Sequence, residues 1–240
     1  DGNDDFGEFF SRDMKDHNIQ PFLLKGQNDT GRAMALISPD SERTFATYLG
    51  AAIELNDSDL TSDQFKDYSI LHIEGYLALN HDLMLKAAEL AKANNMKISI
   101  DMASYNVVED NLEFLKDYVK NNVDIIFANE EESKAFTGKE PEESLNQMAE
   151  LCEIAVVKIG SKGSFVKSKG QVYRINPIKV NPIDTTGAGD LFASGFLYGL
   201  TNKMPLDKCG QIGSLCAGQV IEVIGTKMSP ETWEKIKKEI

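Results

Sequence analysis

The residues with the clearest chemical potential lie near the C-terminal end, where Gly187, Ala188, Gly189 and Asp190 lead into an apolar run typical of a buried helix. Free N–H groups at a helix start, together with the positive end of its dipole, bind anions and suit phosphate. An aspartate there could take a proton from a hydroxyl that attacks a phosphoryl group held by those N–H groups. A simpler interpretation, nearly as well supported by spacing, is that Asp190 caps the helix.

A second candidate site begins at Asn129, which is followed by three glutamates. Asn129 and Glu132 are three residues apart at a predicted helix start, so their side chains share a face. An amide oxygen and a carboxylate there could hold water around Mg²⁺, whereas Glu130 and Glu131 would point elsewhere. The residues alone favour a simpler interpretation, in which the acidic first turn complements the helix dipole.

A third candidate is the run from Lys158 to Gly163, where a predicted strand ends. Gly160 and Gly163 would let the backbone bend close to a ligand on either side of Ser161. The run is neither a Walker A loop nor a dinucleotide fingerprint, because neither glycine pattern is present. A plain hairpin turn explains the same spacing, and the residues alone favour it.

Arg43 is a fourth candidate, because a cation in an acidic chain could neutralise terminal phosphates, and its planar fork suits that task. A surface pair with Asp40 or Glu42 is nearly as well supported. The scattered histidines have no partners at metal-binding spacing, and we assign no chemistry to them. They are His17, His72 and His81.

The elements that must position these residues alternate between buried strands and helices from residue 69 onward, which predicts an α/β fold with a mostly parallel sheet covered on both faces. Ligands of such sheets bind at the carboxyl ends of the strands, where these candidates fall. We expect strands at 69–75, 97–102, 124–129 and 154–160, with antiparallel pieces at 164–168 and 171–175. We expect helices at 80–94, 108–121, from 129, and at 142–151, 188–200, 206–224 and 230–240.

The first part of the chain predicts a helix at 6–17 and half-exposed strands at 21–24, 32–37 and 43–48. A turn at 38–41 would join the last two strands as a hairpin. Residues 20–48 would thus form a small β appendage. The opening lacks the buried strand with which an α/β enzyme normally begins, so we expect an N-terminal part to be missing.

Composition narrows the class of protein. The 240 residues, 42% hydrophobic, suit one large domain or one domain with a small appendage. A net charge of −13 argues against nucleic acid as a partner, and no apolar run reaches the roughly 18 residues that a membrane span needs. Cysteines without metal-like pairing and the absence of a signal peptide predict a cytoplasmic location. The cysteines are Cys152, Cys209 and Cys216.

The stretch DTTGAGDLFASGF, residues 184–196, resembles the second signature of the ribokinase/PfkB family of sugar and nucleoside kinases. The resemblance extends over essentially the whole chain, through DGNDDFG, ERTFATYLGAA, NEEE, VKIGSKGS and GTKMS. It implies a ribokinase-like three-layer sandwich over residues 1–240, with a β lid near 20–48 and without its N-terminal part. It also implies an ATP-dependent phosphotransferase that moves the γ-phosphoryl group to a primary hydroxyl of a sugar.

The resemblance assigns roles to individual residues. Asp190 becomes the general base, Gly187 to Gly189 an anion hole, and Arg43 a contact to phosphates. Asn129 and Glu132 hold Mg²⁺, largely through water. ATP contacts would come from Asn129, Lys158, Gly160, Ser161, Gly163 and Gly189, and substrate contacts from Glu74 and Asp190. A monovalent cation, potassium, would be held by Asp184, Thr186, Val220, Val223, Gly225 and Ser229, several through backbone carbonyls.

Alternatives stay open for the acceptor and the class. The stretches 42–52 and 118–132 look similar to adenosine kinases, which makes adenosine or another ribonucleoside the alternative substrate. Glu74 favours free sugars, although a solvent-facing glutamate explains it as well. Lids in this family often pair across a dimer, so a homodimer through the β lid is a further expectation. A catalytically silent kinase-like binding or regulatory module is the rival from another class.

Overall fold

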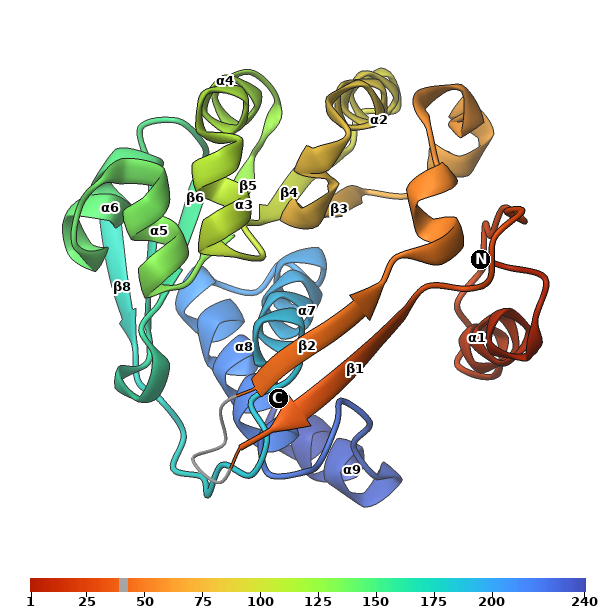
Figure 1. The fold of residues 1–240 in the computed structure, drawn as a ribbon. Helices are drawn as coiled ribbons and strands as arrows, with labels where there is room; N and C mark the ends of the chain where they lie inside the picture. Colours follow the sequence, from red (N-terminus) through yellow and green to blue (C-terminus); the bar gives the residue numbers. More distant parts are fainter. Residues whose placement is uncertain (39–42) are drawn as a thin grey trace.

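The computed structural model describes residues 1–38 and 43–240, and at Ile37 and Arg43 it describes the backbone alone. A six-stranded sheet in the order β3-β4-β5-β6-β7-β8 forms its centre (Figure 1). The first four strands run parallel, and the last two are antiparallel to their neighbours. The strands are β3 (Ile70–Glu74), β4 (Lys97–Asp101), β5 (Ile125–Ala128), β6 (Ile154–Lys158), β7 (Ser164–Ser168) and β8 (Gln171–Ile175).

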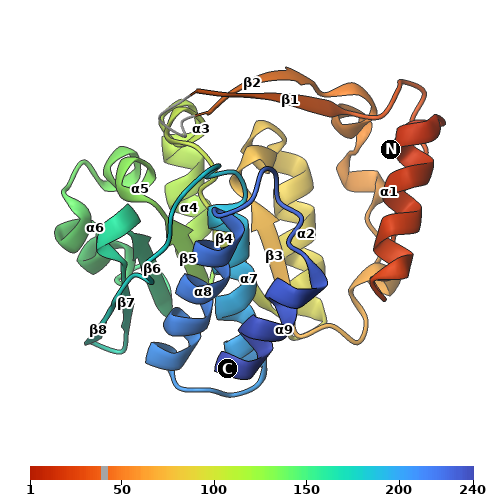
Figure 2. The ribbon, with the colours of Figure 1, turned by 90° about the horizontal axis from the view of Figure 1, so that it is seen from below.

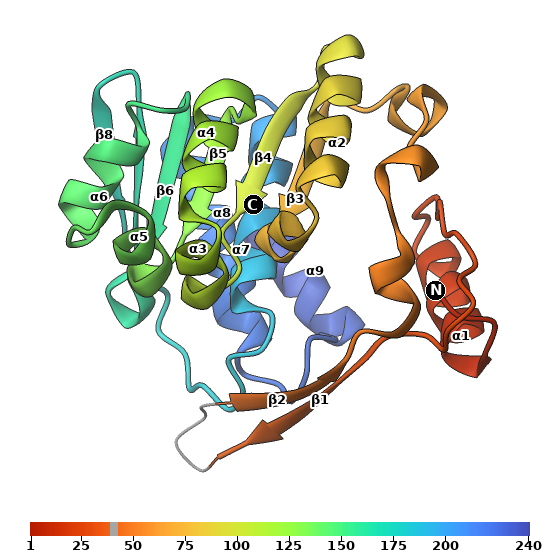
Figure 3. The same cartoon turned by 45° about the horizontal axis from the view of Figure 1, so that its top comes forward.

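Helices cover both faces of this sheet, so the predicted three-layer α/β fold with a mostly parallel sheet is confirmed (Figures 1 and 3). The central strands carry apolar side chains on both faces because both are covered, as in β5, where every residue is buried. One layer contains α2 (His81–Ala93), α3 (Tyr105–Asp110), α4 (Leu112–Asn122), α5 (Glu130–Thr137) and α6 (Pro141–Met148). The other contains α7 (Ala188–Thr201), α8 (Leu206–Val220) and α9 (Pro230–Glu239).

Aromatic packing fixes α7 on the sheet. Phe192 and Phe196 both meet Phe127 of β5 edge-on, with ring centroids 6.4 and 5.3 Å apart. Edge-to-face pairs of this kind add to the burial of apolar area. Because α7 is anchored by these rings, its N-terminal turn comes to lie at the carboxyl end of the sheet.

A two-stranded antiparallel ribbon, β1 (Arg32–Ile37) with β2 (Arg43–Tyr48), lies beyond the carboxyl ends of the central strands (Figures 2 and 3). The helix α1 (Asp5–Asp16) lies beside the end of this ribbon at which β1 begins (Figures 2 and 3). Short 3₁₀ helices connect the ribbon to the sheet and form turns between elements of the sheet domain. These are η1 (Gly50–Glu54), η2 (Asp57–Asp59), η3 (Ser62–Phe65), η4 (Gly75–Leu79) and η5 (Gly160–Lys162). None of the helices in the described residues is long and apolar enough to cross a membrane.

Four of the expected elements are wrong in extent or kind. Residues 21–24 form no strand; they lie along the N-terminus, where Leu24 accepts a hydrogen bond from the terminal amine of Asp1. The helix expected at 108–121 is broken at Asn111, whose side chain hydrogen-bonds the carbonyl of Val107 and competes with the helical backbone. The helices expected at 142–151 and 206–224 end at Met148 and Val220. Of the hairpin turn expected at 38–41, residues 39–41 lie outside the described part.

Candidate active site

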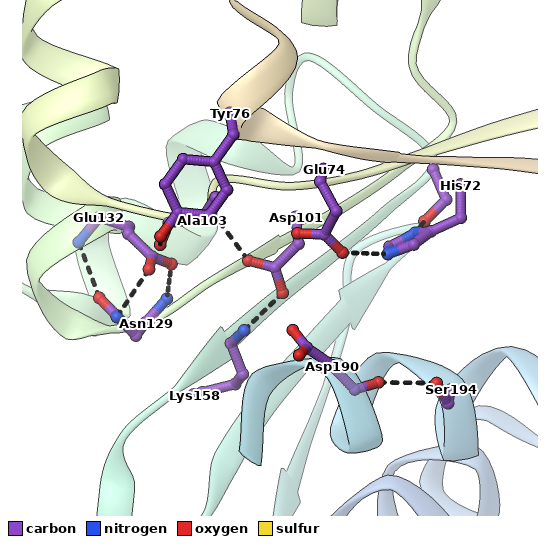
Figure 4. A network of polar contacts seen from close by, with 11 residues as sticks. His72, Glu74, Tyr76, Asp101, Ala103, Asn129, Glu132, Lys158, Asp190 and Ser194 are labelled. Carbon is purple, nitrogen blue, oxygen red and sulfur yellow. Dashed lines mark hydrogen bonds and ion pairs between the residues drawn. The ribbon is translucent and has the colours of Figure 1, made fainter. Parts of the chain in front are cut away.

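Strand ends and one helix start bring polar side chains together at the carboxyl edge of the sheet (Figure 4). Glu74 ends β3, Asp101 ends β4, and Lys158 ends β6. Asn129 follows β5 directly, and Asp190 faces these residues from the first turn of α7. The strand ends of a parallel sheet are the expected place for a ligand site, so residues distant in sequence share one location.

The N-terminus of α7 is built without a side-chain cap. Gly187 is the N-cap residue at φ +79°, and no side chain among the described residues caps the first N–H groups of the helix. The carboxylate of Asp190, three residues on, makes no hydrogen bond within the described part of the chain; only its carbonyl accepts one, from Ser194 at 2.7 Å. The interpretation of Asp190 as a helix cap is therefore wrong. Ala188 N donates to the carbonyl of Thr185 at 3.3 Å. The turn therefore offers its N–H groups to another acceptor chiefly through Gly187 and Gly189.

The surroundings of Asp190 make it a stronger base than an aspartate that is isolated in water. Its carboxylate remains accessible, yet desolvation by the nearby protein raises its pKa, and the charges of Glu74 and Asp101 raise it further. Lys158 and His72 lower that pKa by less. A carboxylate with a raised pKa holds an accepted proton more readily, which suits a general base.

Lys158 lies at the centre of the acidic cluster. Its Nζ forms an ion pair with Asp101 Oδ2 at 2.6 Å, with both side chains largely buried. Burial alone would lower the pKa of Lys158, but the charges of Asp101, Glu132 and Asp190 together raise it. A Cβ placed on Gly189 would come within 3.2 Å of the Lys158 Nζ, so the protonated amine lies against the first turn of α7.

Asn129 and Glu132 form a reciprocal capping box at the start of α5. The Asn129 N–H and Nδ2 donate to the two oxygens of Glu132 at 2.7 and 2.8 Å, and Glu132 N donates to Asn129 Oδ1 at 2.8 Å. These two residues therefore have a structural role as a helix cap, which the sequence analysis did not predict. Glu132 is only 4% exposed, however, and burial raises its pKa to about 7 despite the nearby charge of Lys158.

Two residues of the cluster were missed in the sequence. Asp101 belongs to no recognisable motif, although a charge that ends a buried strand is itself a signal. His72 stands two residues before Glu74 and therefore on the same face of β3. Its Nε2 lies 3.3 Å from Glu74 Oε1, and its Nδ1 lies 3.0 Å from Ser99 Oγ.

The run after β6 forms the turn between β6 and β7. Ile159 N donates to Gly163 O at 2.8 Å, so the hairpin-turn interpretation is confirmed. Gly163 has φ +97°, and a Cβ there would lie 2.0 Å from the carbonyl oxygen of Ile175 in β8, so packing alone requires glycine. Gly160 and Ser161 lie exposed on the outer side of this turn.

The residues expected to hold a monovalent cation lie only partly together. The buried carboxylate of Asp184 accepts hydrogen bonds from Thr186 N at 2.9 Å, Thr186 Oγ1 at 2.6 Å and Gly225 N at 2.8 Å. These contacts join the turn before α7 to the loop after α8. Val220 O accepts from Val223 N at 3.2 Å in that loop. The hydroxyl of Ser229 accepts instead from Thr232 N and caps α9.

Residues 2–233 match the family model described as pfkB family carbohydrate kinase. The chain belongs to the PfkB family. Members of this family are kinases that use ATP with Mg²⁺, so the expected enzyme class is confirmed and the silent-module alternative loses its support. The side chain of Arg43, which the resemblance places at the phosphates, lies outside the described residues of this PfkB chain.

Solved structures place this PfkB kinase among sugar and nucleoside kinases. A probable sugar kinase from Rhizobium etli CFN 42 is 32% identical with a TM-score of 0.94, covering 99% of this chain and 74% of that one. The adenosine kinase from Sinorhizobium meliloti is 30% identical with a TM-score of 0.93, covering 100% and 76%. A putative ribokinase II from E. coli in complex with ATP and Mg²⁺ shares the fold at 21% identity and a TM-score of 0.87, covering 100% and 81%.

Proposed function

We propose that this protein transfers the γ-phosphoryl group of ATP to a primary hydroxyl of a sugar, with Asp190 as general base. The proposal rests on one observation. The Asp190 carboxylate, which makes no hydrogen bond within the described residues, lies in the first turn of α7, whose N-terminus has no side-chain cap. Adenosine or another ribonucleoside is the second candidate acceptor, because similarity to an adenosine kinase extends over the whole chain.

In this mechanism the acceptor hydroxyl gives its proton to Asp190 as its oxygen bonds to the γ-phosphorus and the bond to the ADP oxygen breaks. The N–H groups of residues 187–189 would hold the charge on the phosphoryl oxygens, as donors fixed before the reaction do. Lys158 supplies a cation beside them. Glu74, whose carboxylate is half exposed next to His72, would accept hydrogen bonds from other acceptor hydroxyls.

The nucleotide would border the turn of Gly160, Ser161 and Gly163, with Lys158 and Asn129 towards its phosphates. Asn129 and Glu132 fit a hydrated Mg²⁺, because both Glu132 oxygens already accept hydrogen bonds and so favour contact through water. The ion would neutralise phosphate charge. A nearby cation would also favour the ionised form of Glu132, which burial disfavours.

Three further parts of the proposal concern the periphery of the site. The β1–β2 ribbon, within residues 20–48, would act as a lid over the acceptor, with Arg43 reaching the phosphates and the ribbon pairing with a second copy in a homodimer. Potassium would lie beside the turn formed by Asp184 and Thr186, near the loop that contains Gly225. Carbonyl oxygens of Val220 and Val223 would complete its shell, together with Ser229.

The test is ADP release from ATP and Mg²⁺ in the presence of single acceptors: ribose, fructose, related sugars, adenosine, inosine and cytidine. We expect one sugar to stimulate ADP release well above the rate without acceptor. A nucleoside as the best acceptor would replace the sugar assignment with the second candidate. Stimulation by none of them, with a folded protein, would contradict the proposal.

Changing Glu132 to glutamine is expected to raise the Mg²⁺ concentration needed for half-maximal activity several-fold, with little loss of stability. Glutamine keeps one oxygen to accept from Asn129 N, loses the contact with Asn129 Nδ2, and removes the negative charge. Activity titrated against Mg²⁺ and thermal unfolding measure the two effects. Glu131→Gln is the matched control, since Glu131 is exposed in the same turn. An unchanged Mg²⁺ titration in Glu132→Gln would argue against a role for this carboxylate in holding the ion.

A further inference from the structure

Lys158 has several carboxylates within electrostatic reach but pairs with only one of them. Asp101, Glu132 and Asp190 all act on its charge, yet the ion pair at 2.6 Å is formed with Asp101 (Figure 4). That pair is largely withdrawn from water, where charge interactions are strong and screening by salt is weak. The position of the Lys158 ammonium group therefore depends on which carboxylate attracts it most strongly.

The position of Asp101 is itself fixed by the sheet and by a hydrogen bond to the next turn. It ends β4 in the middle of the parallel sheet, in register with Glu74 on one side and Phe127 on the other. Its Oδ1 accepts a hydrogen bond from Ala103 N at 3.2 Å, and Ala103 has φ +61°, the left-handed region that alanine rarely adopts. The carboxylate thus closes a tight turn with one oxygen and holds Lys158 with the other.

The ammonium group so held lies next to the anion-binding turn. The Cβ position on Gly189 is 3.2 Å from Lys158 Nζ and 3.9 Å from Asp101 Oδ2, so both groups line the first turn of α7. Asp190 follows Gly189 directly and contributes to the field at Lys158. If Asp101 lost its charge, Asp190 and Glu132 would be the remaining anions that attract this lysine.

We propose that Asp101 is a positioning residue that holds the Lys158 ammonium beside the N-terminus of α7 and keeps it from pairing with the base Asp190. The inference rests on the proposed function, because it takes Asp190 as the base and this turn as the phosphoryl site. Asp101 acts through Lys158 and needs no contact with either substrate.

A double-mutant cycle tests this coupling. The variants are Asp101→Asn, Lys158→Met and the double variant, and the readouts are kcat and the dissociation constant of ATP. Asparagine keeps an oxygen for the Ala103 N–H and removes the charge. We expect Asp101→Asn to lower kcat about 10²-fold, the loss that a misplacement near 1 Å causes. In the Lys158→Met background the same change should alter kcat less than about twofold, because contacting residues are not additive. Additive losses would overturn the inference.

Asp124→Asn is the control for removal of an ion-paired carboxylate, here one that is only partly buried. Asp124 pairs with Lys97 at 2.9 Å and accepts a hydrogen bond from Ile98 N at 2.8 Å, at the opposite end of the sheet. It should keep kcat within about twofold of the original, as distant substitutions act independently. If Lys158→Met fails to fold, comparing the kcat of Asp101→Asn with that of Asp124→Asn still tests the inference. An Asp101→Asn variant as active as Asp124→Asn would overturn the inference.

Failure of the inference and failure of the proposed function can be told apart. Near-normal turnover in Asp190→Asn would remove the proposed base, and the proposal about Asp101 would fall with it. Loss of turnover in Asp190→Asn combined with additive losses in the cycle would overturn the Asp101 inference alone. The dissociation constant of ATP across the cycle reports the placement of Lys158 without any dependence on the acceptor.

Discussion

An Asp190→Asn variant is expected to lose turnover by about 10²–10⁴-fold, the range that a positioned general base contributes. Asparagine has nearly the same shape as aspartate but cannot take the acceptor's proton. The ATP dissociation constant should stay close to that of the original protein, because the N–H groups of α7 and Lys158 are untouched. Steady-state kinetics and equilibrium nucleotide binding measure the two quantities.

The matched control is Asp207→Asn, since Asp207 lies in the first turn of α8, away from the site. It should leave kcat nearly unchanged. An Asp190→Asn variant with near-normal kcat would contradict the assignment of Asp190 as the general base. A large loss of ATP affinity with a proportionate loss of rate would instead indicate that Asp190 serves nucleotide binding.

The same carboxylate predicts the acid side of the pH profile. The pKa of Asp190 is raised above its ordinary 3.8 by desolvation and by Glu74 and Asp101. A base must be unprotonated, so kcat/KM should fall as pH drops through this raised value. The folded state binds this proton more tightly than the unfolded chain does, so ionised Asp190 opposes folding above its folded-state pKa. Asp190→Asn should therefore unfold at a higher temperature than the original protein at neutral pH.

The second large effect is expected from Gly187→Ala, which should lower kcat by about 10²–10³-fold, the loss seen when one fixed donor is removed from a charge-stabilising site. Gly187 has φ +79°, and a Cβ there would lie 2.8 Å from Thr226 Cγ2. Alanine would push the turn away from Thr226 and redirect the N–H groups that open α7. Turnover and thermal unfolding measure the loss.

Gly170→Ala separates backbone strain from damage to the site. Gly170 also has φ +79°, in the turn between β7 and β8, but a Cβ there meets no atom within 4 Å. Both variants should lose about 1–2 kcal/mol of stability from the left-handed backbone. Only Gly187→Ala should also lose activity. Equal kcat values in the two variants would contradict the proposal that residues 187–189 hold the phosphoryl group.

The sequence predicted the sheet and its covering helices well because buried parallel strands are continuous apolar runs, as in β5 and β6. It failed at residues 21–24, where strand-like residues have no strand to pair with, and pairing is not a local property. It also failed at Asn111, where a side-chain hydrogen bond to the backbone interrupts an otherwise helical pattern.

The site shows the same division between local and distant information. Asp190, Asn129 and Glu132 stand in local motifs, so their types and spacing mark them as candidates, although the residues alone favour a structural role for Asn129 and Glu132. Asp101 and His72 stand in no motif, and their positions in the cluster follow from sheet register, which sets Asp101 beside Glu74. Asp101 and Lys158 are 57 positions apart in the sequence, yet their charged groups form an ion pair. Spacing in the sequence could not predict that contact.

The hydrogen bonds of Asp184 also bear on how the turn before α7 opens. One carboxylate oxygen accepts from Thr186 and the other from Gly225, 41 positions further along the chain. Segments tied by shared buried contacts unfold locally as one cooperative unit. The turn before α7 therefore cannot fray unless the loop after α8 frays with it. The lifetime of the N-terminal turn of α7, where we propose that phosphate binds, is then set in part by the loop that follows α8.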